Sequence, residues 1–159
     1  MTELATIAPA FVEMAHRIVW CTVATTGTDG RPRTRVLHPI WEWDGTDLTG
    51  WIAMSPLSPK AADLTAQPAV ALTYWAPTHD TCSADCDTTW DTTDEARRAG
   101  WDRFANGPAP VGYDPSIIPP WTSPEAPAFG ILRLRPTRLR VMAGAVMLKG
   151  EGETLIWRV

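Results

Sequence analysis

The sequence predicts a mainly β protein of the α+β class, with a largely antiparallel sheet of about six strands and short flanking helices. Apolar and β-branched segments of strand length recur along the chain and are separated by turn signals such as Asp44-Gly45. Helical spacing of apolar residues is confined to short stretches. This order of elements favours the α+β class, and about six strands can close a small barrel. With 159 residues, we expect one domain over residues 1–159.

The first half of the chain contains most of the expected strands. Apolar residues from Leu4 to Ile18 recur at helical spacing, which predicts an amphipathic helix that ends near Arg17. A turn at residues 27–30 joins the first two strands into a hairpin, and Pro68 ends a short helix before the fourth strand. The expected strands cover residues 18–25, 33–43, 48–54 and 69–75, and the short helix covers residues 60–66.

The second half of the chain is more irregular. It begins with a polar, acidic stretch, which we expect to be a surface loop, and it holds many of the 15 prolines in one long connection. Apolar and polar residues alternate again near the C-terminus, as is typical of strands. The expected elements are a loop over 78–94, a helix over 93–106, an irregular connection over 107–127, one strand or two over 129–142 bent at Pro136, and a strand over 154–159.

Composition limits the classes of partner. Hydrophobic residues make up 45% of the chain and charged residues 20%, as in ordinary globular domains. No segment approaches the roughly 20 apolar residues of a membrane span, and the N-terminus lacks the pattern of a secretory signal. We therefore expect a cytoplasmic protein with no membrane partner. The net charge of -4 argues against nucleic acid as a partner, and three cysteines argue against a disulfide framework.

The segment Ser58-Pro59-Lys60 has the features of an anion site at a helix start. Serine is favoured as an N-cap because its hydroxyl accepts from a free backbone N–H, and proline is favoured at the first helical position. A lysine in the first turn is disfavoured by the helix dipole unless an anion lies there. Free N–H groups, the positive helix end and the ammonium would together hold a phosphate. The alternative is a plain helix cap with a solvated lysine.

Three arginines alternate along the second expected strand. Arg31, Arg33 and Arg35 therefore point to one face of that strand. They would form a solvated outer face, or Arg35, which lies nearest the strand interior, would reach the same anion as Lys60. The pattern alone leaves both interpretations open.

Two motifs carry a resemblance to a known family. The sequence reads GxPxxR at residues 30–35 and SxKAxxLxxxPxVxL at residues 58–72. In this order and at this separation, they resemble the pyridoxamine 5′-phosphate oxidase-like family. Its members are flavin-binding split β-barrels and include the flavin/deazaflavin oxidoreductases. The resemblance covers about residues 18–75, and it implies a split β-barrel for this chain.

The resemblance also implies a role for each matched segment. In such proteins the second strand lays its backbone along the isoalloxazine ring, and the arginine of the first motif points towards the phosphate. The end of the third strand contacts the ring or the ribityl chain, and the second motif holds the phosphate. By that match, the cofactor-binding residues are Arg35, Val36, Leu37, His38, Ala53, Met54, Ser58 and Lys60.

The function implied is that of a flavin-dependent oxidoreductase, which transfers hydride or electrons to a small-molecule substrate. FMN is the first choice of cofactor. The deazaflavin F-420 is the alternative, and its acidic tail would use extra basic residues such as Arg31 and Arg33. Ile40 and Pro59 replace basic residues of pyridoxamine phosphate oxidase itself, so we do not expect that enzyme's own reaction. The family also implies a homodimer with the cofactor at the subunit interface.

Other interpretations use different residues. A non-catalytic flavin- or haem-binding protein on the same barrel would use His38 or His79 as haem ligand, and a module without cofactor would leave Lys60 as a surface residue. Cys82 and Cys86 have a CxxxC spacing, but no second ligand pair accompanies them, so no metal site is expected. No general acid or base stands out, as is usual where the cofactor carries the redox step.

Overall fold

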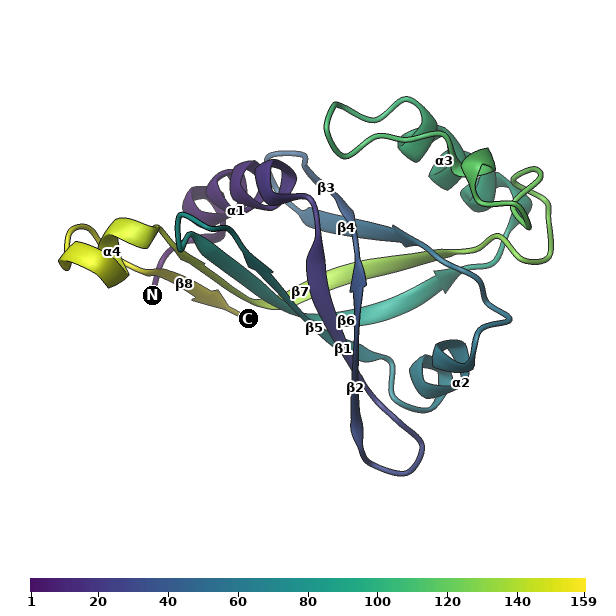
Figure 1. Cartoon of the computed structure of the whole chain (residues 1–159), viewed down its shortest axis with the longest axis horizontal. Helices are drawn as coiled ribbons and strands as arrows, with labels where there is room; N and C mark the ends of the chain where they lie inside the picture. Colours follow the sequence, from purple (N-terminus) through teal and green to yellow (C-terminus); the bar gives the residue numbers. More distant parts are fainter.

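The expected antiparallel sheet is present, but it has eight strands rather than about six (Figure 1). The computed structural model describes residues 1–159. The strand order is β2-β1-β5-β6-β7-β4-β3, with β8 paired to β7, and every pairing is antiparallel. The strands are β1 (Cys21–Thr26), β2 (Pro32–Leu37), β3 (Ile40–Trp43), β4 (Leu48–Ala53), β5 (Ala69–Trp75), β6 (Thr81–Asp91), β7 (Ile131–Met142) and β8 (Leu155–Arg158).

Four α-helices flank this sheet. Three lie where the sequence predicted them, the third of them after β6, and the fourth, a short one between β7 and β8, was not expected (Figure 1). None of the helices combines the length and the apolar character needed to cross a membrane. The helices are α1 (Leu4–Ile18), α2 (Pro59–Ala66), α3 (Asp94–Ala105) and α4 (Gly144–Lys149), and a single 3-10 turn covers Pro115–Ile117.

The main core lies between α1 and the sheet. The apolar face of α1 is fully buried at Ile7 and Phe11, and the Phe11 ring packs edge-on against Trp41 at a centroid distance of 5.0 Å. The Trp41 indole Nε1 donates to the Tyr74 hydroxyl at 2.9 Å, so the polar atoms of both buried rings are satisfied. Burying a side chain such as Phe11 stabilises the fold by about 1.5–3 kcal/mol. A second, smaller cluster, which includes Phe104 and Phe129, lies under α3 and the long connection before β7.

The prediction of a surface loop over residues 78–94 is wrong. Residues 81–91 form β6, which pairs with both β5 and β7 at the centre of the sheet. Its inner face is buried and its outer face is polar, so the strand alternates strictly with small residues at the inner positions. The buried inner residues are Cys82, Ala84, Cys86 and Thr88, and the half-buried Trp90 follows them on the same face.

The single strand expected over residues 33–43 is two strands in the structure, β2 and β3. It breaks at His38-Pro39, after which the chain changes partner: β2 pairs with β1, and β3 pairs with β4. The proline fits this break because it has no N–H to donate to a ladder. In contrast, β7 runs through Pro136 as one strand, opposite a register shift between Asp85 and Cys86 of β6.

The barrel is split rather than closed. β2 and β3 stand at the two ends of the strand order and do not pair with each other. β2 therefore has only one hydrogen-bonded neighbour, and about half of its backbone N–H and C=O groups face away from the sheet. The hairpin that ends in this edge strand, and α2 beside it, form the site described below (Figure 1).

Candidate phosphate-binding site

Helix α2 starts at the predicted place, but its N-cap works differently. Pro59 occupies the first helical position after Ser58, as expected. The Ser58 hydroxyl does not accept from the first helical turn; instead it donates to the Ser55 carbonyl oxygen at 2.7 Å. The backbone N–H of Lys60 has no hydrogen-bond partner within the chain. The helix therefore begins with an unsatisfied donor at its positive end, which is a position that attracts anions.

Lys60 stands in the first turn of α2 without a carboxylate partner. Its side chain is half-buried, and no Asp or Glu oxygen lies within ion-pair distance of its ammonium. Burial lowers the pKa of Lys60, and the positive charge of Arg35 lowers it further. Two cations thus face each other with nothing between them to neutralise their charge.

Arg35 reaches the same place from β2. Its Nη1 donates to the buried Thr25 hydroxyl at 2.8 Å and to the Arg33 carbonyl oxygen at 3.1 Å, and it lies 3.4 Å from the Val23 carbonyl oxygen. These neutral acceptors orient the guanidinium but leave its charge unpaired. Burial lowers the pKa of Arg35, while the nearby Asp63 acts in the opposite direction.

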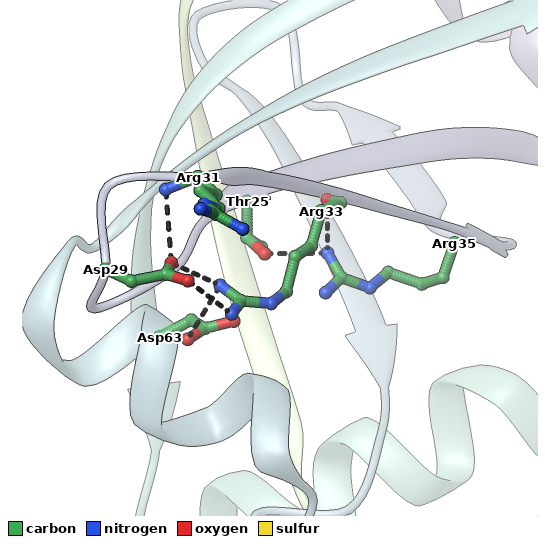
Figure 2. A network of polar contacts seen from close by, with 6 residues as sticks. All are labelled: Thr25, Asp29, Arg31, Arg33, Arg35 and Asp63. Atoms are coloured by element: carbon green, nitrogen blue, oxygen red, sulfur yellow. Dashed lines mark hydrogen bonds and ion pairs between the residues drawn. The ribbon is translucent and has the colours of Figure 1, made fainter.

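Arg33, unlike Arg35, is paired with carboxylates, as Figure 2 shows. Its two terminal nitrogens donate to both oxygens of Asp29, at 3.0 and 3.2 Å. A second carboxylate, that of Asp63 in α2, lies 3.9 Å from its Nη1. Of the two arginines, only Arg33 is therefore neutralised by the protein itself.

These groups line one pocket of about 320 Å³ between the hairpin and α2. Three of its side chains are cationic and one is anionic, which gives a formal charge of 3 - 1 = +2. A phosphate monoester carries close to two negative charges at neutral pH and accepts hydrogen bonds through three oxygens. The donor set therefore fits a phosphate. The lining residues are Arg33, Arg35, Ser58, Pro59, Lys60 and Asp63.

The other predicted site residues are distributed around this pocket. Leu37 and Met54 meet Arg35 and Lys60 around a small hollow beside the barrel core. Val36 points to the opposite face of β2 and is 62% exposed. The structure thus places Arg35, Ser58 and Lys60 in one pocket, with Leu37 and Met54 behind it.

Two predicted residues have their side chains elsewhere. His38 lies between the rings of Trp20 and Tyr113, at centroid distances of 4.9 and 4.8 Å, and its Nε2 donates to the Val111 carbonyl oxygen at 3.0 Å. Burial lowers the pKa of His38, and the bond to that carbonyl opposes the shift. The Ala53 side chain is buried in the cluster under α3. Only backbone groups of these positions could face a ligand in the pocket.

Two polar residues of the pocket were not identified from the sequence. Asp63 follows Lys60 by three positions, and this spacing places both on the same side of α2. Thr25, which orients Arg35, is buried although it reads as an ordinary strand residue. The helical spacing of Asp63 was a usable signal, whereas nothing local to Thr25 indicates its contact.

A second pocket, of about 380 Å³, lies where α2 meets the end of β6 and the segment before β7. Trp90 and Phe129 contribute aromatic walls, and Asp91 contributes a carboxylate that accepts from Arg133 at 2.6 Å. Burial raises the pKa of Asp91, while Arg133 opposes the shift. The polar stretch expected to be a loop therefore contributes to this pocket through the last two residues of β6, Trp90 and Asp91.

The cysteine motif does not form a cluster with its acidic neighbours. Cys82 and Cys86 are buried on the inner face of β6, and burial raises the pKa of both thiols. Asp85 and Asp87 alternate with them and so lie on the outer face. The two thiols are part of the core.

Comparison with known proteins places this geometry in a class. No family model matches the chain, and no curated protein matches it. Among solved structures, a pyridoxamine 5′-phosphate oxidase-related, FMN-binding protein from Nostoc punctiforme is similar at a TM-score of 0.67 and 16% identity, over 100% of this chain and 98% of that one. The chain therefore has the split β-barrel fold of the pyridoxamine 5′-phosphate oxidase-like proteins, as the two motifs predicted.

Other proteins with this fold bind different groups. An F-420 reductase is similar at a TM-score of 0.58 and 17% identity, over 81% of this chain and 94% of that one. A haem-binding protein from Mycobacterium smegmatis is similar at a TM-score of 0.61 and 17% identity, over 99% of this chain and 59% of that one. The choice of ligand must therefore be argued from the pocket.

Proposed function

We propose that this protein binds FMN by its phosphate and is a flavin-dependent oxidoreductase that transfers hydride or electrons to a small substrate. The observation that carries the proposal is the pair of cations without carboxylate partners, Arg35 and Lys60, in one pocket at the start of α2. Leaving two charges unpaired and partly buried costs stability unless an anion compensates them. A dianionic phosphate supplies that compensation.

Different groups of the site would bind different parts of the flavin. Arg35 and Lys60 supply charge, and the free N–H of Lys60 supplies a directed hydrogen bond to a phosphate oxygen. The free edge of β2 offers backbone donors and acceptors along residues 35–38 to the polar rim of a ring. Leu37 and Met54 exclude water behind it. When bound, the flavin supplies the redox chemistry, and the protein supplies its position and electrostatic environment.

A homodimer with the cofactor at its interface is part of this proposal. Val36 and Trp75 are 62% and 55% exposed on the outer face of β2 and β5, and Trp20, which directly precedes β1, is 58% exposed. Thr22 and Thr73, which pair across β1 and β5, lie between them, so this face carries no charge at its centre. An exposed apolar patch of this kind is typical of a protein interface. We name it the tryptophan face.

Two other cofactors are alternatives on the same barrel. F-420 has a phosphate that Arg35 and Lys60 could hold, and an F-420 reductase shares the fold. Haem binding is supported by the likeness to a haem-binding protein, with His38 or His79 as ligand. Against haem at His38 stands the hydrogen bond that already occupies its Nε2. The 380 Å³ pocket beside α2 is the candidate site for a small substrate.

Absorption spectroscopy separates these functions. The purified protein, alone or after addition of FMN, is expected to show the spectrum of bound oxidised flavin, and the bound flavin should be reduced by NAD(P)H or by a reduced-deazaflavin generating system. A Soret band would instead identify haem. A colourless protein that takes up neither FMN nor F-420 would contradict the proposal.

A further inference from the structure

We propose that Asp29 and Asp63 make this pocket selective for a terminal phosphate monoester, such as that of FMN, over a phosphate that continues into an acidic extension. The inference rests on the proposed function, because it concerns the same pocket. It assigns a specificity role to two carboxylates that stand at no specified position of either motif.

The order of side chains along β2 determines where an acidic group beyond the phosphate would lie. Residues 33, 35 and 37 share one face of the strand, and Arg33 lies two residues nearer the hairpin turn than Arg35. With a ring along residues 35–38 and its phosphate at Arg35, any group beyond the phosphate would run towards Arg33 and the turn. Figure 2 shows this succession from Arg35 through Arg33 to Asp29.

Arg33 is not available to such a group. Asp29 accepts from both of its terminal nitrogens at 3.0 and 3.2 Å, and Asp63 lies 3.9 Å from one of them. Arg33 and its two carboxylates have a formal charge of 1 - 2 = -1, and the exposed Arg31 of the same turn brings the sum at this end of the pocket to 2 - 2 = 0. An acidic tail would therefore meet no net positive charge at this end of the pocket.

Both carboxylates are held in place by the fold. Asp29 accepts from the Arg31 backbone N–H at 3.1 Å, within a turn closed by Gly30 at a φ of +77°, a conformation that favours glycine. The Asp63 side chain is only 11% exposed, on the inner side of α2. Because partial burial weakens solvent screening, its repulsion of a second anion is stronger than that of a surface carboxylate.

The two ends of the pocket therefore differ in charge, from +2 at Arg35 and Lys60 to 0 near the turn. Arg35 and Lys60 together match the two negative charges of a monoester. A phosphodiester offers one charge at that place and then presents its tail to Asp29 and Asp63. This arrangement favours a phosphate that ends at Arg35.

The test compares FMN with F-420 bearing its acidic tail, by titration of the full chain, with riboflavin as the ligand that lacks a phosphate. The native protein is expected to bind FMN at least about tenfold more tightly than F-420. Asp63→Asn and Asp29→Asn should each narrow this ratio by about threefold to tenfold, the scale of one nearby unit charge that is partly screened. Glu95→Gln, which removes an exposed charge on α3, is the matched control and should leave the ratio unchanged.

Two outcomes overturn different parts of the account. If FMN binds more tightly than riboflavin but the FMN to F-420 ratio is the same in both Asp variants and in the native protein, the carboxylates do not select the ligand. Tighter binding of F-420 than of FMN by the native protein would overturn the inference in the same way. Equal binding of FMN and riboflavin would overturn the phosphate site itself. If Asp63→Asn fails to fold, Asp29→Asn in the exposed turn decides the question alone.

Discussion

Thr25 is the side chain that fixes the Arg35 guanidinium. Its hydroxyl accepts from Arg35 Nη1 at 2.8 Å from a buried position on β1. Replacing Thr25 by Val keeps the shape of the side chain and the charge of Arg35 but removes this acceptor. We expect FMN affinity to fall by about 0.5–1.5 kcal/mol, the usual contribution of one hydrogen bond. Fluorescence titration with FMN measures the change.

Thr89→Val is the matched control for this substitution. It removes an exposed hydroxyl from β6, beyond the part of that strand that pairs with β5 and outside the tryptophan face. FMN affinity should be unchanged in Thr89→Val, and riboflavin affinity should be unchanged in both variants. Equal FMN affinity in Thr25→Val and the native protein would mean that Arg35 is positioned by other contacts.

His16 makes the stability of the fold depend on pH. The Trp41 backbone N–H donates to His16 Nε2 at 3.0 Å, which requires a neutral ring, and burial lowers the pKa of His16 although Glu42 opposes the shift. The folded-state pKa lies below the ordinary 6.5, so this contribution is complete above pH 6.5 and is lost as the pH falls through the folded-state pKa. We expect a loss of about 1 kcal/mol of unfolding free energy.

Urea unfolding between pH 5 and 8 checks this prediction. His16→Gln keeps an acceptor for the Trp41 N–H but cannot titrate, so its stability should depend less on pH in this range than that of the native protein. His38 also has a lowered pKa and contributes with the same sign in both proteins, so the difference between them isolates His16. Parallel pH profiles would contradict the assignment.

At the residue scale, sequence motifs identified the cations of the pocket but not the two carboxylates that neutralise Arg33. Arg35 and Lys60 were predicted to share an anion, and they do line one pocket. Asp63 and Asp29 were not predicted, because their effect depends on how closely the hairpin approaches α2. The Ser58 hydroxyl was predicted to accept from the first turn of the helix, but it is turned towards the Ser55 carbonyl oxygen, to which it donates. Such competition between local partners is decided by loop geometry that spacing does not encode.

Strand β6 is the element that sequence reasoning missed. Its inner positions hold small residues such as Ala84 and Cys86 rather than large aliphatic ones, and its outer positions are acidic or hydroxylic. Mean hydropathy is therefore low, although the strict alternation was present. The outer acids make sense only once β7 lies beside them, where Asp85 faces Arg138 at 3.6 Å. Long-range pairing, which no local pattern reports, decides this element.

The alternation of buried and outer positions in β6 predicts that the same substitution will have different effects on stability at adjacent positions. Ala84 is 1% exposed, and Ala84→Asp would bury a charge without a partner, so we expect a loss of more than about 3 kcal/mol of unfolding free energy. Ser83→Asp places the same charge on the outer face, opposite Arg140 in the ladder, and should change stability by less than about 0.5 kcal/mol. Comparable urea midpoints for the two variants would contradict this placement of β6.

The whole molecule is expected to dimerise through the tryptophan face. Trp75→Glu places a charge at that face without touching the core, so we expect the dimer dissociation constant to rise by roughly tenfold or more. Sedimentation velocity over a range of protein concentrations measures it. Ile117→Glu, at another exposed apolar residue, is the control and should leave the association unchanged. A native protein that is monomeric at all concentrations would contradict the proposal.

On the scale of the whole molecule, the split-barrel fold does not determine which ligand is bound. Proteins with this fold include an FMN-binding protein, an F-420 reductase and a haem-binding protein. The order of elements around the two motifs was enough to predict this fold from the sequence. The ligand depends instead on a few charges where the hairpin meets α2.

The affinity of FMN relative to riboflavin tests the central claim most directly, because the two differ only in the phosphate. We predict that the native protein binds FMN more tightly by at least about 2 kcal/mol, as expected of charged hydrogen bonds. Lys60→Ala should remove about 1–3 kcal/mol of that preference without changing riboflavin affinity, whereas Lys149→Ala on α4 should change neither. Equal affinities for FMN and riboflavin in the native protein, or unchanged FMN affinity in Lys60→Ala, would contradict a phosphate site at the start of α2.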